Sequence, residues 1–299
     1  MIRKFVRGIA ICACTLLLLA TVSRAADNGA GKSFLWRVQG KTGTIYLFGS
    51  VHLARSDSYP LPAQVEESFA AAGALALEAD PETAQDPAVQ QRMLLAALYP
   101  ASDTLRRHLS KETYELAARE MERIGIPIER FDRTKPWLLA MTIELLELQR
   151  LGYSPENGLD IHFAAKARGK KKIVELESFD AQIDLLNGFS DRDQELFLLY
   201  TIKDMATVRD GMDELMRAWR TGDTKVMEKI IFRPLAEYPD SRPIFDKLYY
   251  RRNREMAGKI EQFLKAGESC FVVVGAAHLI GTEGIVELLK RKGYRVEQM

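Results

Sequence analysis

The feature that most restricts the fold of this chain is a nine-residue pattern found near both of its ends. The residues IYLFGSVHL at 45–53 align with FVVVGAAHL at 271–279. An apolar run that ends in glycine predicts a buried strand whose backbone turns sharply, or closely approaches another segment, at the glycine. His52 and His278 should then project from the carboxyl edge of a sheet, where open α/β proteins place their sites.

The rest of the sequence alternates between apolar strand patterns and longer helical patterns. Strands are predicted at 34–38, 44–48, 74–78, 171–177, 270–274 and 294–297. Helices are predicted at 62–72, in proline-broken pieces over 84–151, at 157–168, over most of 178–267 and at 282–292. This order predicts an α/β protein in which a mixed sheet forms the core and carries a large helical insertion. No low-complexity linker divides the chain, so we expect one domain over residues 26–299.

Composition excludes several classes of protein. Of the 299 residues, 47% are hydrophobic and 28% are charged, which is typical of a globular protein and not of a disordered or polytopic membrane protein. The net charge of +1 gives no reason to expect nucleic acid as a partner.

The first 25 residues have the pattern of a secretory signal peptide. A basic start, Met1–Arg7, precedes the apolar run Ile9–Ala20, and the small residues Ser23 and Ala25 precede the expected cleavage site. The run is too short for a permanent membrane span, and a lipoprotein site at Cys14 would leave most of the run after the cysteine. We therefore predict an exported mature chain, periplasmic if the source is Gram-negative.

Only one cysteine, Cys270, would remain after removal of the signal peptide. An exported chain with one cysteine has no internal disulfide. Because Cys270 lies in the apolar run SCFVVVG, we expect it to be a buried packing residue and not a nucleophile.

Two acidic residues also end apolar strand patterns. Glu78 closes ALALE and Glu177 closes KKIVELE, with Glu175 on the same face two residues earlier. A charge at the end of a buried strand needs a metal or an arginine as partner. Together with the two histidines, Glu78 and one of the later glutamates form a plausible ligand set for Mn, Co, Fe or Zn. The choice between Glu175 and Glu177 stays open.

An ordered set of motifs resembles the TraB/GumN family, which includes the Tiki proteases and is marked by two GxxH motifs. The matching segments are FLWRVQGKTGTIYLFGSVHLA at 34–54, GLD at 158–160, VELES at 174–178, AWRTGD at 218–223, RRN at 251–253 and VVGAAHLIG at 273–281. The resemblance implies a fold related to erythromycin esterase-like and haem-binding ChaN-like proteins. It also implies metal-dependent hydrolysis, which is proteolytic in the Tiki branch.

The family's functional positions transfer to His52, His278, Glu78, Glu177 and Arg252. In the hypothesis that follows, the two histidines and Glu78 bind a divalent metal whose bound water attacks a carbonyl. Glu177 acts as general base, and Arg252 stabilises the oxyanion. The alternative for Arg252 is a solvated charge, because it lies in the basic cluster RRNR.

Two other functions fit the same residues. In the first, one histidine acts as general base without a metal, as the erythromycin esterase-like relatives suggest. In the second, the protein is a non-enzymatic periplasmic binding or regulatory protein whose pocket holds haem, iron or a peptide. The substrate is expected to be a peptide or a small molecule. His108 and His162 follow no apolar strand and are expected to be surface or helix-packing residues, while Asp160 could orient the helix that it begins.

Overall fold

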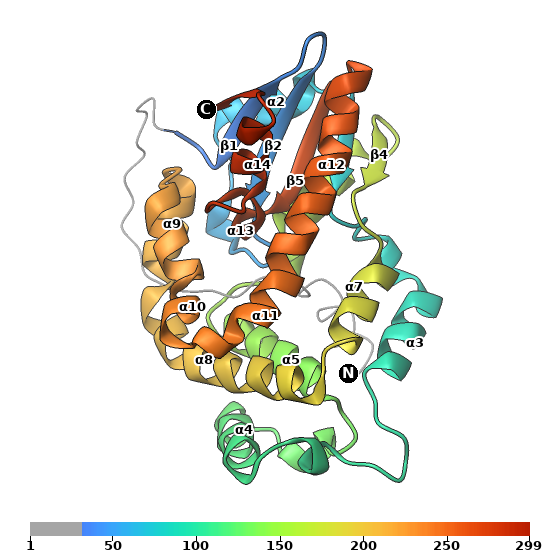
Figure 1. The fold of residues 1–299 in the computed structure, drawn as a ribbon, viewed down its shortest axis with the longest axis vertical. Helices are drawn as coiled ribbons and strands as arrows, with labels where there is room; N and C mark the ends of the chain where they lie inside the picture. The colour runs from blue at the N-terminus through green and yellow to red at the C-terminus, as the bar shows by residue number, and fades with distance from the viewer. Residues whose placement is uncertain (1–31) are drawn as a thin grey trace.

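The computed structural model describes residues 32–299, so the predicted signal peptide lies outside the described residues. A six-stranded sheet with the order β4-β3-β5-β2-β1-β6 forms the upper half of the molecule (Figure 1). The strands are β1 (Leu35–Gln39), β2 (Thr44–Ser50), β3 (Ala74–Leu77), β4 (Lys172–Glu175), β5 (Cys270–Gly275) and β6 (Arg295–Gln298). The sheet is mixed, as predicted.

Four neighbouring strands, β4, β3, β5 and β2, run parallel, whereas β1 pairs antiparallel with both β2 and β6. β5 is the last of these four strands along the chain, yet it lies between β3 and β2. All six of its residues are buried. A parallel strand covered on both faces is expected to be a continuous apolar run, which is what CFVVVG provides. Cys270 is buried in β5, in agreement with its predicted packing role.

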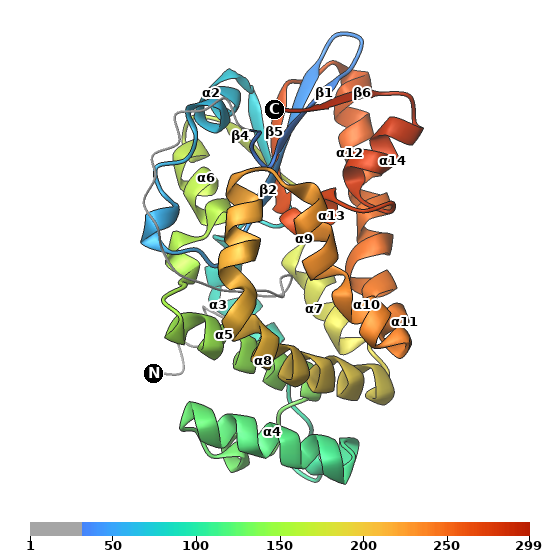
Figure 2. The same ribbon diagram turned by 90° about the vertical axis from the view of Figure 1, so that its left-hand side faces the viewer.

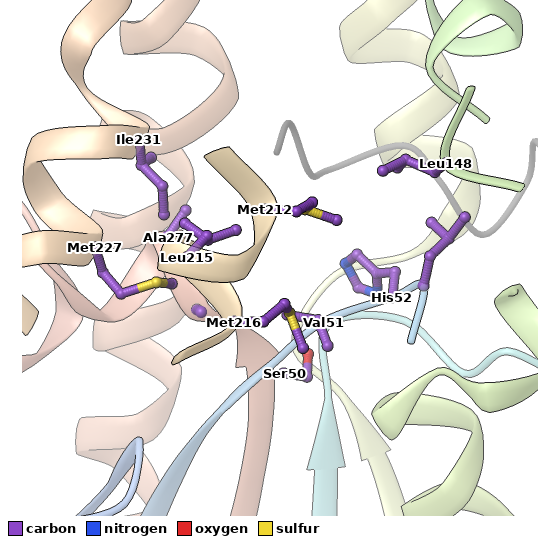
Figure 3. A pocket seen from close by; sticks show the side chains of 12 residues that line it. Ser50, Val51, His52, Leu148, Met212, Leu215, Met216, Met227, Ile231 and Ala277 are labelled. Atoms are coloured by element: carbon purple, nitrogen blue, oxygen red, sulfur yellow. The ribbon is translucent and has the colours of Figure 1, made fainter. Parts of the chain in front are cut away.

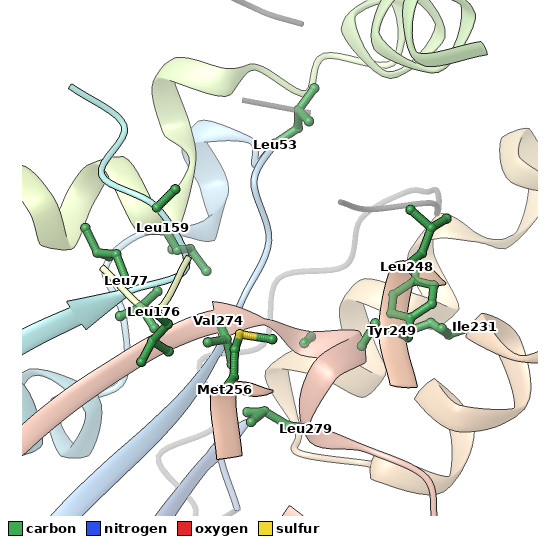
Figure 4. Packing of buried hydrophobic residues seen from close by; sticks show 14 of the residues in the cluster. Leu53, Leu77, Leu159, Leu176, Ile231, Leu248, Tyr249, Met256, Val274 and Leu279 are labelled. Atoms are coloured by element: carbon green, nitrogen blue, oxygen red, sulfur yellow. The ribbon is translucent and has the colours of Figure 1, made fainter. Parts of the chain in front are cut away.

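Helices cover both faces of the sheet. Figure 2 shows α2 (Ala63–Ala71) and α6 (Leu159–Ala167) on one face, with α12 (Arg251–Ala266) and α14 (Ile285–Arg291) on the other. The rings of Phe48, Phe69, Phe163 and Phe271 pack together between the sheet and the first pair, with centroids 4.8–5.8 Å apart. Leu77, Leu176, Val274 and Met256 are buried in the same hydrophobic cluster (Figure 4).

The remaining helices form a layer next to the sheet (Figures 1 and 2). They are α3 (Pro87–Ala96), α4 (Lys111–Ile124), α5 (Pro136–Arg150), α7 (Phe179–Asn187), α8 (Asp191–Arg220), α9 (Thr224–Ile231), α10 (Arg233–Glu237), α11 (Arg242–Phe245) and the four-residue α13 (Ala276–Leu279). The long helix α8 reaches the sheet at its C-terminal end, where Trp219 Nε1 donates a hydrogen bond to the carbonyl of Gly49 at 2.7 Å. No helix within residues 32–299 combines the length and apolarity needed to cross a bilayer.

Two predicted elements differ from the structure in a way that concerns the site. The strand predicted at 171–177 ends at Glu175, so Glu177 lies beyond it. The helix predicted at 282–292 begins only at Ile285, as α14, and the short helix α13, directly after β5, was not predicted. Both differences occur at the carboxyl edge of the sheet, where the chain turns away from the strand direction to form the site.

Candidate active site

The two GxxH motifs meet because their strands are neighbours. In the parallel pair of β2 and β5, Ser50 lies opposite Gly275, so both histidines follow at the same edge of the sheet. His52 comes two residues after β2, and His278 lies in α13. A methyl group built on Gly275 would lie 3.5 Å from His278 Cδ2 and 3.7 Å from His52 Nε2. The histidines predicted to converge are therefore brought to one point.

In both motifs the glycine allows another group to lie close to its Cα. It does not form a turn, since neither glycine has a positive φ. A Cβ on Gly49 would lie 2.4 Å from Phe34 Cδ1, inside the van der Waals contact of a buried ring. A Cβ on Gly275 would enter the space between the histidines and would also lie 3.3 Å from Glu78 Oε1.

Two carboxylates reach the same place from β3 and β4. Backbone pairing continues past these strands, with Glu177 N donating to the carbonyl of Glu78 at 2.7 Å. Glu175 takes a different role, because its Oε1 accepts a hydrogen bond from the backbone N–H of Asp80 at 2.7 Å. The structure thus places Glu177, and not Glu175, beside Glu78 at the site.

Arg252 joins these two carboxylates and is 3% exposed. Its Nη2 lies 2.9 Å from Glu78 Oε2 and 2.7 Å from Glu177 Oε2, and its Nε also bonds both Glu177 oxygens. Its Nη1 donates to the carbonyl of Leu248 at 2.9 Å. The alternative of a solvated charge at Arg252 is therefore wrong. In this arrangement the guanidinium neutralises two carboxylates, so it could contact an oxyanion only by releasing one of them.

Asn253, the next residue of α12, fixes the orientation of His278. Its Nδ2 donates to the carbonyl of Glu283 at 2.8 Å, which leaves Oδ1 as the acceptor for His278 Nδ1 at 2.6 Å. His278 Nδ1 must then carry the proton, and Nε2 keeps its lone pair. His278 is fully buried.

Asp160 makes an ion-pair contact with His52, and not a hydrogen bond like the one between Asn253 and His278. Its Oδ1 lies 3.3 Å from His52 Nδ1, and both side chains are buried. A carboxylate only accepts hydrogen bonds, so a neutral His52 would carry its proton on Nδ1 and direct the Nε2 lone pair toward Gly275. The Nε2 atoms of His52 and His278 are both buried without a hydrogen-bond partner among residues 32–299.

The surroundings shift the pKa values of the three central groups in different directions. Burial lowers the pKa of His52, but the Asp160 carboxylate outweighs it and the pKa is raised to about 9. Burial dominates at His278 and lowers its pKa to about 4. Burial would raise the pKa of Glu78, yet the positive charge of its neighbours, Arg252 among them, lowers it to about 2. The pKa values of the two histidines are therefore shifted in opposite directions.

The donor chemistry fits a divalent transition metal. His52 Nε2 and Glu78 Oε1 lie 3.7 Å and 3.3 Å from the position of a Cβ on Gly275, and His278 Nε2 lies 3.6 Å from Glu78 Oε1. His278 is oriented through its other nitrogen by Asn253, as is usual for metal-bound histidines. As they stand, no three His, Cys, Asp or Glu side chains in the described part of the chain are spaced to hold an ion. Both oxygens of Glu78 are already engaged, Oε2 by Arg252 and Oε1 by the N–H of Gly275.

The two remaining histidines lie away from this cluster. His108 contacts Asp103 and Asp191, and His162 contacts Glu66. Sequence reasoning missed Asn253, whose only signal was its place after the arginine in RRN.

The fold and the site define an α/β protein with a buried cluster of two histidines, two glutamates and an arginine at the carboxyl edge of its parallel strands. The sequence matches the TraB/PrgY/gumN family over residues 34–298, and the chain belongs to this family. The resemblance inferred from the motifs is thereby confirmed.

Similar proteins differ in how much is known of them. The Escherichia coli protein YbaP, described as uncharacterized, is 25% identical over 82% of this chain and 87% of its own length. A metalloprotease TIKI homolog of Amphimedon queenslandica is 24% identical over 95% of this chain and 65% of its own, and human metalloprotease TIKI1 is 21% identical over 89% and 61%. The chain thus spans under two thirds of these metalloproteases. No solved structure matches it significantly, so the expected likeness to erythromycin esterase-like and ChaN-like folds stays a prediction.

Proposed function

We propose that this chain is an exported hydrolase that acts on a peptide or small-molecule substrate with the help of a divalent transition metal. The observation that carries the proposal is that His52, His278 and Glu78 all have an atom within 3.7 Å of a Cβ placed on Gly275, and that Nε2 of each histidine is buried without a hydrogen-bond partner in the described part of the chain. The names of the Tiki relatives support the hydrolytic class, and the basic and apolar N-terminal pattern supports export.

In this proposal His52 and His278 hold the metal through Nε2, with Glu78 as third ligand. A bound cation of this kind lowers the pKa of its water and polarises a substrate carbonyl. Asp160 and Asn253 keep the two rings in the orientation that directs Nε2 at the cation. Mn, Co, Fe and Zn all remain candidates for this metal, because each of them accepts a mixture of nitrogen and oxygen donors.

Glu177 and Arg252 handle protons and charge beside these ligands. Glu177 lies next to Glu78 and is the carboxylate that we assign as general base. Arg252 holds both glutamates in place, and transfer of its Nη2 from Glu78 to the developing oxyanion would free Glu78 for full ligation.

The test is elemental analysis of the purified mature protein beside the His52→Ala/His278→Ala variant. We expect about one transition-metal ion per chain in the parent and a loss of at least ten-fold in the variant. A His108→Ala/His162→Ala variant is the matched control, since it removes two histidines outside the cluster and should keep the metal. Full metal content in the His52→Ala/His278→Ala variant would exclude the ligand assignment.

A second candidate function is metal-independent hydrolysis with a histidine as general base. His278 favours it, because its lowered pKa keeps the imidazole neutral and its hydrogen bond to Asn253 leaves the Nε2 lone pair to accept a proton. Turnover of a peptide library that survives EDTA, in protein shown to be metal-free, would favour this function over the first.

A further inference from the structure

A small cavity of about 30 Å³ adjoins His52. Five elements contribute to its walls, among them β2 with Ser50, α8 with Met212 and Met216, and α9 with Met227 (Figure 3). The other two are α5 and α13, and His52 follows β2. These residues are far apart in the sequence and meet only because the helical layer covers the carboxyl edge of the sheet. The cavity therefore lies beside the group on which the proposed chemistry depends.

The lining is apolar except at one place. Apart from His52, no side chain with an ionisable group lines the cavity among the described residues. Ser50 is 0% exposed, and its hydroxyl has no hydrogen-bond partner within residues 32–299. Apolar walls with a few unsatisfied polar groups at one side are typical of a substrate pocket, in which the polar groups orient the ligand.

The chemistry and size of the cavity restrict what it can accept. A charged side chain would lose its hydration without gaining a partner, so it is excluded. One water-sized group needs about 10–15 Å³ of such volume, so the cavity has room for about two. That space suits the end of a small aliphatic side chain such as alanine or valine. The methionines that form much of its wall are unbranched and flexible, so their truncation should enlarge it without distorting the sheet.

We propose that this cavity is the specificity pocket of the enzyme and accepts a small aliphatic side chain of the substrate next to the bond that is cleaved. The inference rests on the proposed hydrolase function for its role in catalysis. The rival explanation is a packing void between helices. Similar small apolar cavities occur elsewhere in the helical layer, but the ones lined by Phe245 and by Trp137 include neither histidine of the site.

Binding can be tested without activity or metal. In protein labelled with methionine methyl-¹³C, N-acetyl-valine methylamide should shift the methyl signals of Met212, Met216 and Met227 in a saturable manner. N-acetyl-aspartate methylamide should leave them in place, and Met121, buried in α4, provides an internal control. Absence of saturable shifts, or equal shifts with the charged probe, would identify the cavity as a packing void and overturn the proposal.

Cleavage preference gives the second test. Met216→Ala enlarges the cavity, so the preferred residue in a random peptide library should change from alanine or valine toward leucine or phenylalanine by about ten-fold or more in kcat/KM. Met121→Ala, an equally buried truncation in α4, should leave the preference unchanged, and Met227→Ala provides a second enlargement if Met216→Ala fails to fold. Retained activity with an unchanged preference in the enlarged variants argues against the pocket. If the parent protein cleaves no peptide, the peptide substrate of the proposed function is excluded, while the binding experiment still decides the pocket.

Discussion

Single residues at the carboxyl edge have separate roles even where the two motifs look alike. Gly49 admits the ring of Phe34, whereas Gly275 keeps open the space between His52, His278 and Glu78. A methyl group on Gly49 would displace packed side chains. A methyl group on Gly275 would occupy the place proposed for the metal ion. The repeat in the sequence therefore combines a packing requirement in one copy with a functional requirement in the other.

Gly275→Ala and Gly49→Ala should separate these requirements. We expect Gly275→Ala to lower metal content and turnover at least ten-fold with little loss of stability, because its contacts of 3.3–3.7 Å are tolerable for folding. Gly49→Ala should instead cost about 1–3 kcal/mol of unfolding free energy through the clash with Phe34. Urea unfolding and metal analysis of both variants provide the measurements, and the same loss of stability in both would contradict the distinction.

Glu144 in α5 is a buried acid that the proposed chemistry does not use. It is 3% exposed, one of its oxygens has no partner among the described residues, and burial together with the negative charge of Asp204 raises its pKa well above the ordinary value. Because the folded pKa is above the unfolded one, folding takes up a proton at pH values between the two. The stability of the protein should therefore fall as pH rises above about 4.5 until the folded group ionises.

Glu144→Gln should remove this dependence. We expect the variant to gain stability relative to the parent between pH 5 and pH 8, by at most about 1.4 kcal/mol for each pH unit. Glu147→Gln, one turn later in the same helix, is the control, since Glu147 pairs with Arg123 and its neutralisation should give no gain. Urea denaturation at the two pH values measures the difference, and a gain of equal size at both would show that proton uptake by Glu144 is not its source.

At the scale of elements, α12 connects the two sides of the site. Its first turn supplies Arg252 to the carboxylates after β3 and β4, and Asn253 to the histidine after β5. A stretch of π-helix at Asp246–Tyr250 precedes this turn, a feature that is frequent at functional sites. The position of α12 is therefore determined by polar contacts in addition to its packing on the sheet.

Arg252→Ala should destabilise the protein by about 3–5 kcal/mol, because it leaves two buried carboxylates without a counter-charge. Arg251→Ala, at the neighbouring position where the side chain is 72% exposed, should change stability by less than about 0.5 kcal/mol. Adding Glu177→Ala to Arg252→Ala should restore part of the loss. Chemical denaturation followed by tryptophan fluorescence measures all three, and equal effects of the two arginine variants would show that the buried cluster does not anchor α12.

The elements themselves could largely be predicted from the sequence, whereas their spatial relations could not. The six predicted strand segments overlap every observed strand, and the glycine before each histidine located the edge of the sheet, because strand burial and period leave a local signal. The choice of Glu177 over Glu175 depended on where β4 ends, which local pattern does not determine. The burial of Arg252 and the methionine cavity arise from contacts between α8, α9, α12 and the sheet, and such contacts leave no periodic signal.

At the scale of the whole molecule, both ends of the described chain contribute to one sheet. The central strand β5 comes near the C-terminal end yet separates β2 from β3, and the last residue lies beside the first strand. Ser33 N donates to the carbonyl of Met299, and Met299 N donates to that of Leu35 at 2.9 Å. The sheet is therefore complete only when residues after 267 are present, while the described ends are close enough to be joined by a short linker.

Circular permutation and truncation should have opposite results. A chain that ends at Gly267 lacks β5, so β2 and β3 lose their common neighbour and we expect no cooperative unfolding transition. A permuted chain that begins at Ile126, joins Met299 to Ser33 through a short glycine-serine linker and ends at Gly125 keeps every strand. The new ends lie at an exposed turn where Gly125 has φ +89° and open space around it, so we expect a loss of no more than about 3 kcal/mol. Thermal unfolding followed by circular dichroism measures both. Because the permuted chain preserves the neighbours of β2 and β5, it should also keep the metal content of the parent. A permuted chain that folds but binds no metal would show that the natural order of the elements along the chain, and not the sheet alone, is needed to bring the two histidines together.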